Sequence, residues 1–295
     1  MAEGLQRDPL NVEGLADPVN TSYAAGGSPE TGNPPIVLLH GFDSSCLEFR
    51  RLFPLLSERT DTYAVDLIGW GFTETGHTDD GAVEGPPIGP DQKRAHLYAF
   101  WEQKLQKRKM VLVGASLGGA TAIDFAVEHP EAVERLVLVD SQAFIDGVDS
   151  MWKPLAMMGL SVLQSKPLRD LANKMAYYDK ERLATKDAMH VGRLHTFMPG
   201  WKEAGFAFME SQGYKISKKV SQISVPTLIC WGRQDEILDP ANAKRFEEEI
   251  EGSKLVWLEE CGHCGHLEQP QRLAAEIFDF MSIEAAQPEL AAKQS

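Results

Sequence analysis

The segment Val111-Leu-Val-Gly-Ala-Ser-Leu-Gly-Gly119 runs from an apolar stretch through a glycine-flanked serine into a helical pattern. It predicts a strand, a turn too tight for large side chains, and a helix, with Ser116 at the apex. The flanking glycines leave room for a strained turn that exposes the serine. Because unpaired amides and the helix dipole favour negative charge at a helix N-terminus, Ser116 suits acyl transfer through a covalent ester.

The composition describes an ordinary globular protein. The 295-residue chain is 43% hydrophobic and 24% charged, and it is long enough to bury a sizeable core. A formal net charge of −14 disfavours nucleic acid as a partner. No stretch approaches the roughly 18 uninterrupted apolar residues of a membrane span, so no span is expected.

The N-terminus and the cysteines bear on location. Residues Met1 to Asp8 have neither the apolar core of a secretory signal nor the Arg- and Ser-rich character of a transit peptide. Cys230 lies within an apolar strand pattern, which indicates a buried thiol and not half of a disulfide framework. The expected location is cytoplasmic, or an organellar stroma if a transit peptide has been removed.

Short apolar runs alternate with amphipathic helical patterns along most of the chain. This alternation predicts an α/β fold with a doubly wound, mostly parallel sheet. The expected strands are 36–39, 62–66, 110–113, 136–139, 227–231 and 254–258. The expected helices are 47–57, 91–106, 119–128, 240–250 and 271–283. Residues 76–90, which are rich in Gly and Pro, are expected to form a surface loop.

The alternation stops between Ser141 and about Ser221, where the pattern becomes mainly helical. An insertion between core strands lies at the carboxyl ends of the sheet, where ligands bind in open α/β folds. Its many Met and aromatic residues suit an apolar ligand, although each of them singly is better explained by the insertion's own small core. The predicted organisation is an N-terminal lead-in (1–33) with one short strand near 19–23, an α/β core (34–141 and 222–284), a helical cap (142–221) and a flexible tail (285–295).

A serine nucleophile needs a base, and the base needs an orienting acid. Two later segments supply them, each just after an expected strand: Asp235 follows Gly232, and His263 follows Gly262. Asp235 is therefore the expected acid and His263 the expected base. Asp239 is a weaker alternative for the acid, and His266 is a weaker alternative for the base.

An oxyanion hole is expected from the segment Ile36-Val-Leu-Leu-His-Gly-Phe-Asp43, a strand that ends in His-Gly. The loop after this strand can direct the Phe42 amide to the same point as the Leu117 amide. Two converging backbone donors stabilise an oxyanion by about 3–4 kcal/mol each in systems where one donor was removed. His40 is expected to hold this loop rather than to act as a second base.

The segment Cys261-Gly-His-Cys-Gly-His266 offers four ligand types within six residues. Closed zinc sites gather their ligands from two separated pairs, and ligands this crowded do not easily reach one tetrahedral ion. We therefore expect no metal and no cofactor.

These motifs together resemble the α/β-hydrolase superfamily, and specifically its capped serine-hydrolase branch of esterases and lipases. The resemblance covers about residues 34–280 and implies Ser116 as nucleophile, His263 as base and Asp235 as its partner. It also implies backbone amides of Phe42 and Leu117 as the oxyanion hole. Thr73 departs from the serine that the family often has at that structural position. The matching motifs are His40-Gly-Phe42, Asp66-Leu-Ile-Gly-Trp-Gly71, Gly114-Ala-Ser-Leu-Gly118, Gly232-Arg-Gln-Asp235, Gly262-His263 and Leu267-Glu-Gln-Pro270.

The expected function is a serine hydrolase of the carboxylesterase type, which cleaves an ester or related acyl bond of a small, largely apolar substrate. Serine at the turn disfavours dehalogenation, because an alkyl-enzyme ester needs a carboxylate nucleophile. Two alternatives stay open. One is a hormone-like ligand receptor that keeps the same triad with slow turnover, and the other is an acyltransferase. Oligomeric state is left open.

Overall fold

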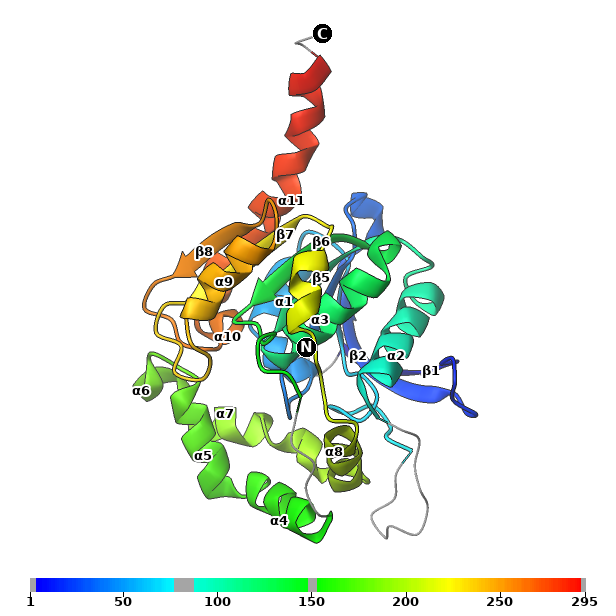
Figure 1. Cartoon of the computed structure of the whole chain (residues 1–295), viewed down its shortest axis with the longest axis vertical. Helices are drawn as coiled ribbons and strands as arrows, with labels where there is room; N and C mark the ends of the chain where they lie inside the picture. The colour runs from blue at the N-terminus through cyan, green and yellow to red at the C-terminus, as the bar shows by residue number, and fades with distance from the viewer. Residues whose placement is uncertain (1–3, 77–87, 148–152, 293–295) are drawn as a thin grey trace.

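The fold is built on one eight-stranded sheet with the strand order β1-β2-β4-β3-β5-β6-β7-β8. It is seen in a computed structural model that describes residues 4–76, 88–147 and 153–292 (Figure 1). Strands β1, β2 and β4 pair antiparallel, and all further pairs are parallel. The strands are β1 (Leu5–Leu10), β2 (Val19–Gly26), β3 (Ile36–Leu39), β4 (Thr62–Val65), β5 (Met110–Ala115), β6 (Val133–Val139), β7 (Thr227–Gly232) and β8 (Lys254–Leu258).

Helices cover both faces of the sheet, because its central strands are buried on both sides. In β3, Val37 and Leu39 face the helices α2, α3 and α9, whereas Ile36 and Leu38 face α1 and α11. Successive side chains of a strand point to opposite faces, so a continuous apolar run serves two cores. These helices are α1 (Leu52–Ser57), α2 (Pro90–Gln103), α3 (Leu117–Glu128), α9 (Ala241–Glu249) and α11 (Pro270–Ala292), with the short α10 (Gly265–Glu268) before α11.

A group of helices is inserted between β6 and β7, and we call its members α4 to α8 the cap helices. Figure 1 shows them in green and yellow-green below the sheet, at the end of the molecule opposite α11. They have a small core of their own, formed by Ala156, Leu160, Trp201 and Phe206. The cap helices and the 3-10 helices that accompany them are α4 (Lys153–Leu163), α5 (Lys166–Met175), α6 (Lys180–Leu183), α7 (Lys186–Val191), η5 (Leu194–Phe197), α8 (Trp201–Glu210) and η6 (Ser217–Gln222).

The N-terminal segment differs from the predicted loose lead-in, since it adds two antiparallel strands to the sheet. The predicted strand near 19–23 is present and extends to Gly26. Strand β1 was missed because most of its side chains are exposed, so it lacks an apolar pattern. Its Pro9 has no amide hydrogen, which an edge strand tolerates.

Two predicted helices have different limits. The helix expected over 47–57 is divided into a 3-10 helix η3 (Cys46–Phe49) and α1. Pro54 lacks an amide hydrogen and clashes with the carbonyl four residues before it, so it fits only in the first turn of α1. At the other end, α11 continues to Ala292, past the predicted start of the tail at residue 285. Most of the loop expected over 76–90 lies outside the described residues.

The four cysteines are free thiols, and Cys230 is fully buried as predicted. Among the helices of the described ranges, none is both long enough and apolar enough to cross a membrane.

Candidate active site

Ser116 lies at the corner between β5 and α3, with φ 51° and ψ −122°. A positive φ is strained for a residue with a side chain, and such strain persists only where the surroundings enforce it. The chain passes so closely here that only glycine fits on either side. A Cβ on Gly114 would lie 2.4 Å from the Gly118 carbonyl oxygen, and one on Gly118 would lie 2.1 Å from the Leu39 carbonyl oxygen.

Backbone hydrogen bonds hold this corner. The Ser116 amide donates to the Val139 carbonyl at 3.0 Å, and the Ser116 carbonyl accepts from Gly119 at 2.9 Å and Gln142 at 3.0 Å. Leu117 is the first residue of α3, so its amide has no acceptor within the helix. The corner therefore presents a hydroxyl and a free helix-end amide side by side.

His263 and Asp235 form a buried pair at the ends of β8 and β7. The Nδ1 of His263 lies 2.8 Å from Oδ2 of Asp235. The other carboxylate oxygen accepts from the amides of Ile237 at 2.7 Å and Leu238 at 3.0 Å. Burial alone would lower the pKa of His263, but the Asp235 carboxylate outweighs it and raises this pKa above the usual 6.5. The pair can therefore hold and stabilise an imidazolium.

Ser116 and His263 line one cavity of about 350 Å³ between the sheet edge and the cap helices. Much of the wall is apolar and is contributed by α5, α7 and the ends of their neighbours. Many polar and charged residues also line the cavity, among them Glu48, Arg50 and His266. Such a mixture is typical of a small-molecule site. The apolar wall includes Leu47, Leu163, Leu168, Ala172, Ala176, Met189, Val191, Ile237 and Leu267.

The loop after β3 borders the same cavity through Gly41 and Phe42. Its approach is close, because a Cβ on Gly41 would lie 3.1 Å from the Ser116 Cβ. His40 lies beneath the loop, with Nδ1 2.8 Å from the Gly41 carbonyl oxygen and Nε2 3.3 Å from Asp66. Burial alone would lower the pKa of His40, but the Asp66 carboxylate raises it overall. His40 thus contacts the peptide unit that carries the Phe42 amide.

A family model for the alpha/beta hydrolase fold matches residues 34–270. The chain belongs to the α/β-hydrolase family. It is 37% identical over 252 residues to alpha/beta hydrolase domain-containing protein VTE7 of Arabidopsis thaliana, over 84% of this chain and 74% of that protein. It is 26% identical to human monoacylglycerol lipase ABHD6, over 84% of this chain and 75% of that protein. A thermophilic esterase from Thermogutta terrifontis has the same fold with a TM-score of 0.76, at 19% identity over 94% of this chain and 98% of the esterase.

The predicted family and fold are thereby confirmed. In this α/β hydrolase the two weaker alternatives from the sequence lie apart from the Asp235–His263 pair. Asp239 is exposed and accepts from the Ala241 amide at 2.9 Å, where it caps a turn. His266 pairs instead with Glu48, at 3.0 Å from Nε2 to Oε1, although the two groups are not aligned as a hydrogen bond.

The segment of crowded Cys and His residues does not gather around one point. His263 faces Asp235, whereas His266 faces Glu48. Within the part of the chain that the structure describes, no three His, Cys, Asp or Glu side chains are placed to hold a metal ion.

Asp140 is a buried carboxyl group of the hydrolase core that the sequence analysis missed. It directly follows β6, has φ 44°, and accepts from the Gly232 amide at 2.6 Å. Burial raises its pKa well above the usual 3.8, which favours the protonated form near the Asp235–His263 pair. Its signal in the sequence is an acid directly after an apolar strand, the same signal that singled out Asp235.

Glu268 is a second missed group, although it lies within a family motif. Its carboxylate accepts from the Gly262 amide, one residue before His263. It also accepts from two amides beyond α5, those of Tyr178 at 3.3 Å and Asp179 at 2.9 Å. One buried side chain thus joins the His263 loop of this hydrolase to the segment between α5 and α6.

Proposed function

We propose that this α/β hydrolase is a serine hydrolase that cleaves a carboxylic ester, or a related acyl bond, through an acyl-enzyme on Ser116. The observation that carries the proposal is the buried Asp235–His263 hydrogen bond of 2.8 Å beside the cavity that the strained Ser116 also lines. A nucleophile, a base and an acid that orients the base are the parts that acyl transfer requires.

In the proposed mechanism Ser116 Oγ attacks the acyl carbonyl carbon while Nε2 of His263 takes its proton. The carbonyl π bond breaks, and its electron pair forms an oxyanion that accepts from the Phe42 and Leu117 amides. Asp235 stabilises the imidazolium, which gives its proton to the alcohol oxygen as the carbonyl re-forms and the C–O bond to this leaving group breaks. Water deacylates the enzyme by the same steps, with His263 taking one proton from water and returning it to Ser116.

The cavity supports a small substrate with an apolar acyl or alcohol group. Much of its wall is aliphatic, and its volume is about 350 Å³. Burial alone would raise the pKa of Glu48, but the pair with His266 lowers it to about 2, so an anion lines the wall at neutral pH. The same wall also contains Arg50 and Arg169, so charged groups of both signs reach the cavity. In this proposal residues 142–221 act as a cap over a core formed by 34–141 and 222–284.

The test is turnover of p-nitrophenyl esters of increasing acyl length by the whole chain and by Ser116→Ala. We expect Ser116→Ala to lose kcat by on the order of 10⁴–10⁶, as nucleophile removal does in serine hydrolases. Ser282→Ala is the matched control, because this exposed serine of α11 donates to a carbonyl of its own helix. Undiminished turnover in Ser116→Ala, or ligand-dependent melting shifts without any turnover, would contradict the proposal.

A further inference from the structure

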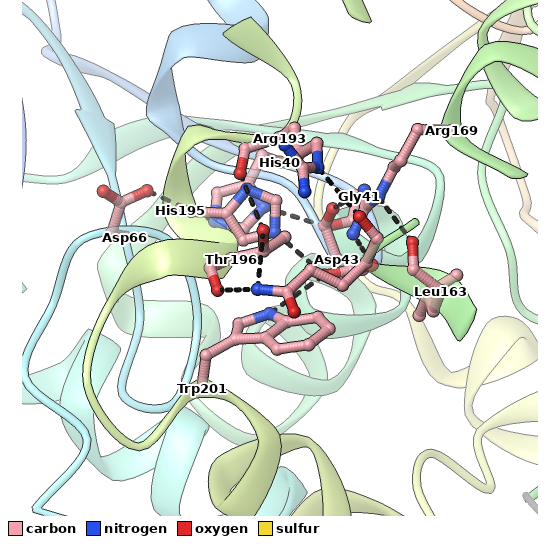
Figure 2. Close-up of polar contacts among 11 residues, drawn as sticks. His40, Gly41, Asp43, Asp66, Leu163, Arg169, Arg193, His195, Thr196 and Trp201 are labelled. Carbon is pink, nitrogen blue, oxygen red and sulfur yellow. Dashed lines mark hydrogen bonds and ion pairs between the residues drawn. The ribbon is translucent and has the colours of Figure 1, made fainter. Parts of the chain in front are cut away.

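The side chain of Asp43 connects the loop after β3 to the cap helices. Its Oδ1 accepts from Nε2 of His195 at 2.8 Å and from Nε1 of Trp201 at 3.1 Å. Its Oδ2 accepts from Nη2 of Arg169, and its backbone carbonyl accepts from Nη1 of the same guanidinium at 3.2 Å. Figure 2 shows these three donors converging on the one carboxylate.

The donors come from three separate elements, namely α5 for Arg169, η5 for His195 and the start of α8 for Trp201. All are largely buried, with side-chain exposures of 12% for Arg169 and 1% for His195, against 7% for Asp43. A buried carboxylate that receives charged and neutral donors together is strongly held. Asp43 is therefore fixed only where these three elements lie in their observed places.

Further contacts link the three elements to each other around this carboxylate. Nε of Arg169 donates to the Leu163 carbonyl at 2.9 Å, which joins α5 to the end of α4. Gln164 donates to the Thr196 carbonyl at 2.6 Å, which joins the α4–α5 junction to η5. A displacement of one element would thus be transmitted to the others and to Asp43.

Asp43 also constrains the backbone beside the expected oxyanion donor. It has φ 49°, a left-handed conformation that is uncommon for a residue other than glycine. The peptide unit formed by the Gly41 carbonyl and the Phe42 amide is planar and trans, so fixing the carbonyl fixes the direction of the amide. His40 contacts that carbonyl from the core at 2.8 Å. Asp43 anchors the next turn of the loop from the cap helices.

We propose that Asp43 is a positioning residue that couples the placement of α5, η5 and α8 to the loop after β3, so that the Phe42 amide is correctly aimed only when these elements are docked. This inference rests on the proposed function. It gives the cap helices a part in catalysis besides enclosing the substrate, since their position sets an oxyanion donor.

The experiment measures kcat and KM for a short p-nitrophenyl ester, with active enzyme counted by burst titration. We expect Asp43→Ala to lower kcat by about 10- to 100-fold, somewhat less than outright removal of an oxyanion donor. KM should change by less than about 3-fold, because the loss falls on the transition state. Asp43→Asn should recover part of kcat, since asparagine tolerates a positive φ and keeps one acceptor oxygen.

A purely structural role would lower the melting temperature and the count of active molecules, but would leave kcat per titrated site unchanged. That result would overturn the inference. Arg169→Gln and Trp201→Phe keep Asp43 and remove the guanidinium and the indole N–H, respectively. They replace Asp43→Ala in the test if that variant does not fold. We expect each to lower kcat by about 3- to 10-fold, and Asp43→Ala with Arg169→Gln to lower it by less than the product of the two effects.

Two controls separate this inference from the function on which it rests. Asp170→Ala removes another carboxylate of α5, one that is 38% exposed and pairs with Lys174, and it should leave kcat unchanged. Ser116→Ala is measured in the same assay. If turnover persists without Ser116, the proposed function fails. If turnover requires Ser116 but kcat per site is normal in Asp43→Ala, Arg169→Gln and Trp201→Phe, only the positioning role fails.

Discussion

The loop after β3 and the loop after β8 are each joined to the neighbourhood of the cap helices by one buried carboxylate, but in different ways. Asp43 accepts from side chains that lie 126 to 158 residues away in the sequence, on three elements. Glu268 accepts from backbone amides, one at Gly262 in the loop after β8 and two at Tyr178 and Asp179.

The Asp43 connection depends on particular side chains, whereas the Glu268 connection depends on backbone amides. Every residue except proline has an amide hydrogen, so the Glu268 connection depends on the path of the chain and not on particular partners. The Asp43 connection exists only because Arg169, His195 and Trp201 carry donors at the right places. The loop after β3, which carries the proposed oxyanion donor, thus depends on the arrangement of the cap helices, whereas the loop after β8 depends on the path of one short segment.

The largest effect should come from the Asp235–His263 pair, which belongs to neither the Asp43 nor the Glu268 connection. Asp235→Asn should lower kcat by about 10⁴-fold, because an amide in place of the carboxylate favours the wrong tautomer of the base. Kinetics with a short ester measure it, and Asp239→Asn is the control for an exposed acid nearby. Equal losses of kcat in Asp235→Asn and Asp239→Asn would show that Asp235 has no special role. The difference between the two loops would then have no bearing on catalysis.

Glu268→Ala tests the backbone-directed connection. It should lower the free energy of unfolding by about 2–4 kcal/mol, because the buried Gly262 amide loses its acceptor and two more amides lose a charged partner. His263 keeps two other contacts, its 2.8 Å bond to Asp235 and its amide bond to the Ala176 carbonyl at 2.9 Å.

Because of those remaining contacts, kcat per active site should fall less in Glu268→Ala than in Asp43→Ala. Urea unfolding and burst titration give both quantities. Glu259→Ala, in which an exposed surface carboxylate is removed, is the matched control and should change stability little. If kcat falls in Glu268→Ala while the free energy of unfolding does not, Glu268 would have the positioning role that we assign to Asp43.

The pH dependence of kcat/KM reports on His263, which lies in the loop after β8. The proposed base must be neutral to accept a proton, so kcat/KM should fall as the pH falls through the pKa of His263. That pKa is raised by Asp235, so the midpoint should lie above about 6.5. Below it the rate should drop about tenfold per pH unit. A midpoint well below 6 would contradict the buried ion pair.

Asp140→Asn should have the smallest effect. This third carboxyl group connects two parts of the core, the end of β6 and the end of β7. Burial holds its pKa high, so an uncharged amide resembles the protonated acid and can still accept from the Gly232 amide. Stability should change by less than about 1 kcal/mol and the pH midpoint should not move. A downward shift of the midpoint, measured on the same ester, would show instead that Asp140 is ionised and supports the imidazolium.

The sequence predicted the elements whose own residues are sufficient to define them. The apolar run Ile36–Leu39 is a strand in the structure within the same limits. The carboxyl ends of parallel strands meet at one edge, so the order of the chain was enough to predict that Asp235 and His263 lie together. Ser116 was predicted at a turn between a strand and a helix, and the structure places it there.

What the sequence could not provide depends on partners far along the chain. Asp43 was visible in the loop motif, but its role requires the packing of Arg169, His195 and Trp201, which no local pattern encodes. The pairing of His266 with Glu48 was missed for the same reason. Strand β1 was missed because an edge strand with exposed side chains has no apolar alternation.

The central claim is that Ser116 is the nucleophile of an acyl-transfer site, and covalent labelling tests it most directly. The whole chain is treated with a fluorophosphonate, and the modified peptide is identified by mass spectrometry. We expect one adduct, on Ser116, which forms more slowly in Asp235→Asn and not at all in Ser116→Ala. An adduct on another residue, or a chain that hydrolyses esters without being labelled on Ser116, would contradict it.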